Sequence, residues 1–93
     1  MIGSVRHKAL RKFLDDGSTK GLPQELVPRL RRMLSAMQAS ESLEPLETVA
    51  GWRLHGLKGD LHGYWSLSVS GNWRLIFTWV DGVANDLDLV DYH

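Results

Sequence analysis

The second half of the chain alternates apolar and polar residues at every second position, and this pattern limits the fold more than any other feature. The alternation begins at Trp52 and continues to Val90. A tight turn at 70–71 and a strong hairpin signal at 81–82 interrupt it. We therefore predict antiparallel strands at 52–55, 64–69, 72–79 and 86–90.

Two amphipathic helices precede these strands. The first is predicted at His7–Asp16 and ends at Gly17. The second covers about Pro23–Ala39, where leucines and methionines recur at steps of three and four residues. Pro28 does not suit a helix interior, because it lacks an N–H and disfavours helical geometry at the preceding residue. We therefore expect a short opening turn, with the main helix beginning at about residue 27.

The remaining segments complete an α+β arrangement. Ile2–Val5 is a candidate edge strand, and residues 40–50 form a connector with one helical turn. We predict that the N-terminal strand and the two helices pack on one face of a twisted, mainly antiparallel sheet, whose other face is open. A row of aromatic residues is expected to pack under the helices; it consists of Trp65, Trp73, Phe77 and Trp79.

Composition excludes several classes of protein. The chain has 93 residues, so we expect one domain over 1–93. It has no cysteine, which rules out disulfides and thiolate metal sites and is compatible with the cytosol. No apolar run approaches the roughly 20 residues of a membrane span, and the N-terminal MIGSVRHKAL lacks the apolar core of a signal peptide. We therefore expect a cytoplasmic location and no membrane association.

The net charge of zero hides an asymmetry between the two halves of the chain. Residues 1–40 carry eight Lys/Arg and three Asp/Glu, whereas residues 41–93 carry three and eight. Either the two halves attract each other or cover opposite faces, or the basic helices contact RNA phosphates or an acidic partner. The candidate contacts lie on the second helix, away from its apolar stripe; they are Arg29, Arg31 and Arg32.

Arg74 stands among apolar residues on a central strand and faces away from the aromatic row. Removing a guanidinium from water is costly unless an anion pairs with it. One interpretation is a structural ion pair with Asp86 or Asp88 across the hairpin. The other is a phosphate clamp, because the planar fork of donors matches phosphate oxygens. Lys58 lies in a glycine-rich loop at 56–60, where it is either a solvated loop lysine or a ligand contact, although the spacing is not that of a nucleotide P-loop.

Histidines and the end of the chain supply groups that can transfer protons. The four histidines show no i,i+4 or CxxC-like spacing, which argues against a zinc site. His55 faces the predicted open side of the sheet. The chain ends Asp91-Tyr92-His93 directly after a strand, and by alternation Tyr92 shares the face of Arg74. A frayed terminus is the alternative interpretation of these three residues.

The stretch LHGLKGDLHGYWSLSVSGNWRLIFTW, followed by the terminal VDYH, resembles the HigB-type toxins of the RelE/ParE superfamily. MIGSVRHKALRKFL and the helix around LVPRLRRML also fit, so the resemblance spans nearly the whole chain. It implies the small RelE-like fold and a cytoplasmic toxin of a type II toxin–antitoxin pair. The implied partner is a HigA-type antitoxin with a helix-turn-helix domain, through which the toxin associates indirectly with operator DNA.

The resemblance further implies a ribosome-dependent endoribonuclease. Such a toxin enters the A site of the 70S ribosome and cleaves mRNA during translation, without a metal or other cofactor. The 2′-hydroxyl of a nucleotide attacks the adjacent phosphate, which gives a cyclic phosphate and a free 5′-hydroxyl. The family's catalytic positions correspond to His55, Lys58, Arg74, Asp91, Tyr92 and His93, and the expected RNA-binding residues are Arg29, Arg31, Arg32 and Arg53.

Chemistry suggests a role for each catalytic position. His55 or Asp91 would be the general base, and His93 is a candidate acid. Lys58 and Arg74 would stabilise charge on the phosphoryl oxygens. The remaining residue, a tyrosine at 92, would stack on a base or orient the phosphate.

Two other functions are compatible with the same fold. A ParE-type toxin inhibits DNA gyrase and cleaves no RNA, and the set of proton-transfer groups argues against it. A non-catalytic module would use its sheet only to contact a protein partner. One feature departs from a nuclease: the hairpin strand carries Asp81, Asp86 and Asp88. Negative charge near a phosphate site weakens RNA binding, so these carboxylates either point away or orient Arg74.

Overall fold

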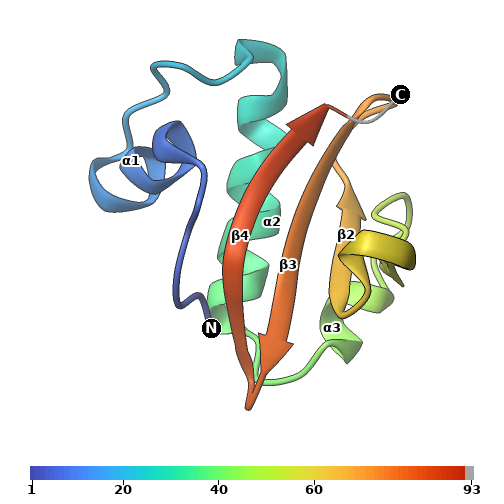
Figure 1. Cartoon of the computed structure of the whole chain (residues 1–93). Helices are drawn as coiled ribbons and strands as arrows, with labels where there is room; N and C mark the ends of the chain where they lie inside the picture. The colour runs from blue at the N-terminus through green and yellow to red at the C-terminus, as the bar shows by residue number, and fades with distance from the viewer. Residues whose placement is uncertain (92–93) are drawn as a thin grey trace.

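The structure is a computed structural model that describes residues 1–91, and it has the predicted α+β architecture (Figure 1). Within these residues, helices cover one face of a four-stranded sheet, and α2 runs behind β3 and β4 (Figure 1). The helices are α1 (Lys8–Asp16), α2 (Val27–Ala39) and the short α3 (Glu44–Glu47). The strands are β1 (His55–Gly56), β2 (Tyr64–Ser68), β3 (Trp73–Val80) and β4 (Val83–Asp91). The 3₁₀ turns are η1 (Gln24–Leu26) and η2 (Gly59–Leu61).

The named strands are antiparallel and follow the order β1-β2-β3-β4. The turns predicted at 70–71 and 81–82 connect β2 to β3 and β3 to β4. Strand β1 is shorter than the strand predicted from Trp52, because Arg53 adopts a positive φ of 51° that ends the extended conformation. Trp52 is nevertheless buried, and its carbonyl accepts a hydrogen bond from the backbone N–H of Ser68 at 2.7 Å.

The N-terminal segment lies beside β4 at the edge of the sheet, as predicted for residues 2–5 (Figure 1). It runs parallel to β4 and pairs through isolated bridges rather than a continuous ladder. A bulge in β4 interrupts the ladder: Asp86 has a φ of 53°, and its N–H donates to Ser4 Oγ at 2.9 Å. The extra residue lets Ala84 and Leu87 both be fully buried, which strict alternation would prevent.

Local chemistry sets the ends of the two main helices. His7 caps α1 instead of starting it, because its Nδ1 accepts a hydrogen bond from the N–H of Leu10 at 3.2 Å. The helix ends at Gly17, whose φ of 80° favours glycine. Helix α2 begins at Val27 after η1, so the short opening turn predicted from Pro28 is confirmed.

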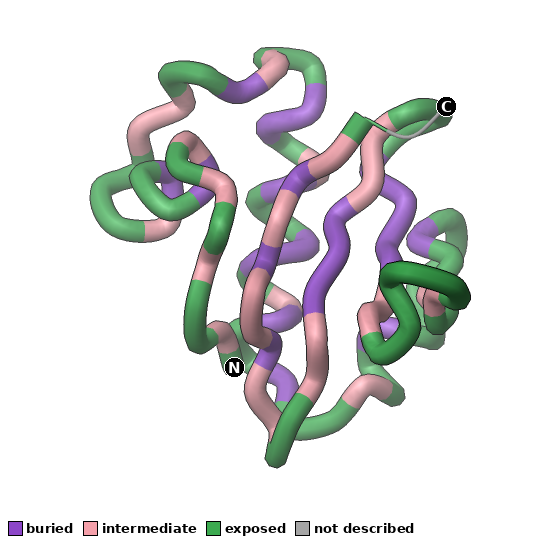
Figure 2. Tube along the Cα trace, viewed as in Figure 1, coloured by how far each residue is buried: buried purple, intermediate pink, exposed green. Residues whose placement is uncertain are grey.

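The core lies between the helices and the sheet, as the purple segments of α2, β3 and β4 show in Figure 2. Phe77 is fully buried, which confirms the predicted place of the aromatic row. The three tryptophans of the row are only half-buried and pack against the edge of the same core; they are Trp65, Trp73 and Trp79. The fully buried side chains of α2 are Leu30, Met33 and Met37.

Gly82→Ala should lower the free energy of unfolding by about 1–2 kcal/mol, because Gly82 sits in the hairpin turn with a left-handed φ of 79°. An added Cβ would also lie 3.0 Å from the backbone oxygen of Glu41, which cannot move aside as a side chain can. Urea denaturation measures the loss. Gly71→Ala is the matched control, since a Cβ there would meet nothing within 4 Å. Equal stability of the two variants would contradict this account of the turn.

Candidate active site

A small pocket of about 90 Å³ lies on the sheet face that points away from the helices. The loop that contains η2 lies in front of this face beside β2 (Figure 1). Ile76 is only 6% exposed although it lies outside the main core, because this loop covers part of the sheet face. The predicted open face is therefore a partly covered concave surface. The pocket is lined by His55, Leu57, Leu61, Ser66, Arg74, Ile76 and Val90.

His55 joins this pocket through the register of the sheet. It pairs with Ser66, which pairs with Ile76 on the next strand, and directly opposed residues share a face. The Nδ1 atom of His55 lies 3.0 Å from the carbonyl oxygen of Arg53. Because a carbonyl oxygen only accepts, this hydrogen bond requires a proton on Nδ1 and leaves Nε2 of the neutral ring as the basic nitrogen. Such a tautomer suits a general base.

Arg74 is anchored by the backbone of the β2–β3 turn. Its Nη1 donates to the carbonyl oxygens of Ser70 at 2.6 Å, Gly71 at 3.2 Å and Trp73 at 3.1 Å. These contacts hold the guanidinium beside the pocket before any substrate binds. The turn between two strands thus positions a cation that the sequence alone placed only on a face of the sheet.

The ion pair considered between Arg74 and Asp86 or Asp88 does not form in the described part of the chain. Asp86 lies in the bulge of β4, where its backbone N–H binds the N-terminal segment. Asp88 accepts a hydrogen bond from the N–H of Leu89 at 3.0 Å. Asp86 and Asp88 therefore do not orient Arg74, whereas carbonyl oxygens of the β2–β3 turn accept hydrogen bonds from it.

Lys58 lies in the loop that covers the pocket. It is exposed and caps η2, and its neighbour Leu57 lines the pocket while its own side chain does not. Gly59, with a φ of 68°, lets the chain turn back directly after the lysine. His62 in the same loop is exposed and does not line the pocket. The loop therefore brings one cation, but no second histidine, to the border of the pocket.

Asp91 is the last described residue of the predicted chain-end triad. It is exposed and pairs with Trp73, so its side chain leaves the sheet on the side of the aromatic row. Val90, one residue earlier, lies on the face of the pocket. Tyr92 and His93 lie outside the described residues.

A second pocket, of about 370 Å³, lies where the β2–β3 turn meets the beginning of α2. Three arginines line it, and no Asp or Glu among the described residues does. Arg29 reaches it from α2, where its Nη2 donates to the carbonyl oxygens of Gly51 at 2.8 Å and Ser68 at 3.4 Å. The other two arginines are Arg53 and Arg74. Because Arg74 lines both pockets, the two are adjacent.

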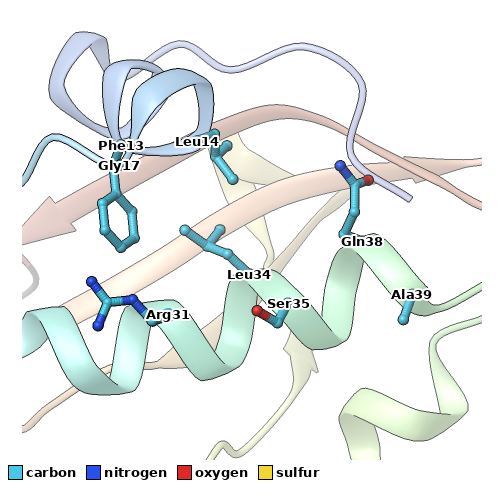
Figure 3. Close-up of a pocket in the computed structure, with 8 residues that line it drawn as sticks. All are labelled: Phe13, Leu14, Gly17, Arg31, Leu34, Ser35, Gln38 and Ala39. Carbon is cyan, nitrogen blue, oxygen red and sulfur yellow. The ribbon is translucent and has the colours of Figure 1, made fainter.

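Arg31 lies elsewhere, in the groove between α1 and α2 that Figure 3 shows. Its guanidinium carbon stands 5.5 Å from the centre of the Phe13 ring, which is a cation–π contact. Leu34 adds to the apolar lining of this groove, whose volume is about 470 Å³. Arg32 is exposed. Of the helix arginines expected to contact RNA together, only Arg29 lies with Arg53 and Arg74.

Apolar residues that shape the first pocket were missed by the sequence analysis. Leu57 precedes the turn η2 and Leu61 is its last residue, both within a glycine-rich loop, and Val90 lies near the end of β4. The sequence does contain a signal for this packing: two leucines lie four residues apart in an otherwise polar loop, whereas a fully solvated loop is usually polar. The loop therefore has a packing role.

Two kinds of site are absent from residues 1–91. No group of three or more His, Asp or Glu side chains there is placed to hold a metal ion. No helix in this part is both long enough and apolar enough to cross a lipid bilayer.

Sequence comparison identifies relatives over nearly the whole length. Residues 3–93 match the family described as the RelE-like toxin of type II toxin–antitoxin system HigB. The chain is 39% identical over 93 residues to Endoribonuclease HigB of Proteus vulgaris, and the match covers 100% of both chains. It is 36% identical over 85 residues to Toxin HigB-1 of Vibrio cholerae serotype O1, and the match covers 90% of each chain.

Structure comparison finds the same fold in more distant proteins. YafQ from Escherichia coli superposes with a TM-score of 0.58 at 16% identity, covering 98% of this chain and 91% of YafQ. A chain of the YoeB–YefM complex from Staphylococcus aureus superposes with a TM-score of 0.57 at 18% identity, covering 100% of this chain and 95% of that one. At these identities the likeness concerns the fold alone.

Proposed function

Because the chain belongs to the HigB family of RelE-like toxins from type II toxin–antitoxin systems, we propose that it is an endoribonuclease that stops translation by cutting mRNA. The relative from Proteus vulgaris, which matches over the full length, is named an endoribonuclease. One observation carries the proposal: a basic imidazole nitrogen and a guanidinium, from His55 and Arg74, line one pocket of phosphate size.

The reaction that these groups support is a transesterification within the RNA strand. His55 Nε2 removes the proton of a 2′-hydroxyl, and the 2′-oxygen forms a bond to the adjacent phosphorus. The bond from phosphorus to the 5′-oxygen breaks, and an acid returns a proton to that oxygen. The products are a 2′,3′-cyclic phosphate and a free 5′-hydroxyl. Atoms and charge balance in this reaction without a cofactor. We propose that His93 is the acid that returns the proton to the 5′-oxygen.

Cations stabilise the charge that builds on the phosphoryl oxygens during this reaction. Arg74 is held by turn carbonyls before substrate binds, and such preorganisation makes electrostatic stabilisation effective. Lys58 supplies a second positive charge from the loop beside the pocket. Tyr92 stacks on a base or orients the phosphate, as aromatic residues do with splayed single-stranded RNA.

His55 is a better candidate for the general base than Asp91. The imidazole lines the pocket, and its hydrogen bond to Arg53 leaves Nε2 as the basic nitrogen. Asp91 pairs with Trp73, so its carboxylate lies on the face of the sheet opposite to the pocket. We therefore propose that Asp91 does not abstract the proton. Its proposed role, at the end of β4, is to support the last two residues.

The family implies where the toxin acts and what restrains it. We propose that the chain works in the cytoplasm, in the A site of the 70S ribosome, where mRNA is single-stranded and its backbone can be distorted. We further propose that a HigA-type antitoxin with a helix-turn-helix domain neutralises it and links it to operator DNA. Neutralisation requires only a surface that covers the pocket or blocks entry to the ribosome.

Induction of the chain in growing cells, followed by mapping of mRNA 5′ ends, tests the proposal. We expect growth arrest and new 5′-hydroxyl ends inside translated codons. DNA breaks with intact mRNA would instead indicate a gyrase inhibitor of the ParE type. Neither effect, with no toxicity from a folded protein, would indicate a binding module without catalysis.

A further inference from the structure

We propose that the pocket lined by Arg29, Arg53 and Arg74 binds a second phosphate of the RNA strand, next to the phosphate that is cleaved. We call it the arginine pocket. The inference rests on the proposed nuclease function and adds a subsite that fixes the position of the strand. At about 370 Å³, the arginine pocket has room for a phosphodiester together with part of its sugar.

The charge of the arginine pocket calls for an anion. Three arginines line it, and no carboxylate among the described residues does. A phosphate offers several acceptor oxygens to the forked donors of arginine, which makes it the anion that this geometry favours.

Arg29 gives this pocket a fixed donor. Hydrogen bonds from Nη2 to the carbonyls of Gly51 and Ser68 tie the side chain to the loop and to β2. Its Nε is the buried side-chain nitrogen or oxygen in residues 1–91 that has no hydrogen-bond partner. Buried donors are nearly always satisfied, so the protein alone does not meet the bonding capacity of this arginine. A bound phosphate would add the missing negative charge beside it.

The two pockets are spaced for one strand. Arg74 lines both of them, so their occupants would lie within the reach of a single arginine side chain. Consecutive phosphates of RNA are separated by one nucleotide, and this spacing is similar to the reach of an arginine side chain. A strand with its scissile phosphate beside His55 therefore brings a neighbouring phosphate to the arginine pocket.

Arg53 connects the second phosphate to the chemistry. Arg53 lines the arginine pocket, and its carbonyl oxygen holds Nδ1 of His55. Occupation of the arginine pocket thus acts on the residue that orients the proposed base. Arg53 is a positioning residue in this scheme and does not touch the reacting atoms.

Binding of an uncleavable RNA tests the inference without requiring cleavage. The probe is a short 2′-O-methyl oligoribonucleotide in which one phosphate at a time is replaced by a neutral methylphosphonate. For the unmodified chain, we expect two adjacent linkages whose neutralisation weakens binding about tenfold each. Arg53→Gln should abolish the effect at one linkage and keep it at the other. It should also reduce the slope of log K against log salt concentration by about 0.7.

Arg6→Gln is the matched control, because Arg6 is exposed and lines neither pocket. It should leave both sensitive linkages in place. The inference would be overturned if neutralising only one linkage weakened binding to the unmodified chain. It would also be overturned if neutralising either of the two linkages still weakened binding to the Arg53→Gln variant. Both results would leave the proposed nuclease function intact. Weaker binding of Arg53→Gln to vacant 70S ribosomes alone, with the oligonucleotide unaffected, would also overturn the inference, because the pocket would then hold ribosomal RNA. Loss of mRNA cleavage by the unmodified chain would refute the proposed function and not this binding result.

Discussion

His55→Asn should slow RNA cleavage by about 10²–10⁴-fold, because it removes the proposed general base. The asparagine side chain places an N–H donor close to the position of Nδ1, so the hydrogen bond to the Arg53 carbonyl is kept. His55 is exposed on a strand of two residues, so the fold should tolerate the change. The measurement is single-turnover cleavage of an mRNA on programmed ribosomes, with the melting temperature recorded in parallel.

His62→Asn provides the control for this experiment. It removes the same imidazole from the neighbouring loop, where His62 is exposed and does not line the pocket. It should cleave at the rate of the unmodified chain. If His55→Asn retained activity within a few fold while Asp91→Asn lost it, the base would be Asp91, and our interpretation of the pocket would be wrong.

Much of the fold followed from three features of the sequence. The period of two from Trp52 predicted the long strands, and the glycine at 82 predicted the hairpin between the last two. Pro28 predicted the break before α2. These features succeed because each depends on local sterics, which a few neighbouring residues decide.

The deviations arise from contacts between distant segments. The bulge at Asp86 places its N–H on Ser4 Oγ, and backbone hydrogen bonds on both sides of this contact pair the N-terminal segment with β4. Nothing near Asp86 in the sequence specifies that partner. Likewise, the left-handed backbone of Arg53 shortens β1, and a residue with a Cβ adopts this conformation only where surrounding structure imposes it. Periodicity cannot report such tertiary effects.

The candidate site, too, was predicted in part from the sequence, and the rest depends on contacts between distant segments. Alternation placed His55 and Arg74 on one face of the sheet, and the pocket contains both. Linear position grouped Arg29 with Arg31 on one helix, but residues two apart do not share a helix face. Arg31 lies over Phe13 of α1, whereas Arg29 lines the arginine pocket. The arginine pocket combines a helix, a loop and a turn, so only the assembled chain reveals it.

Arg74→Lys should lower the rate of the chemical step by about 10²–10³-fold, although the positive charge is retained. A lysine presents a point charge, and it cannot hold turn carbonyls and phosphate oxygens at once as a planar fork can. Because charge still attracts the RNA, we expect KM to change little and kcat to fall. Steady-state cleavage on ribosomes over a range of mRNA concentrations separates the two effects.

A purely structural role for Arg74 gives a different result, and this difference makes the experiment decisive. Its Nη1 contacts with Ser70, Gly71 and Trp73 stabilise the turn, so Arg74→Lys will cost some stability in either case. If stability were the whole effect, lowering the assay temperature well below the melting transition would restore kcat. If Arg74 stabilises the transition state, kcat stays low in a fully folded variant, and Arg6→Lys, which changes an exposed arginine away from both pockets, keeps full activity.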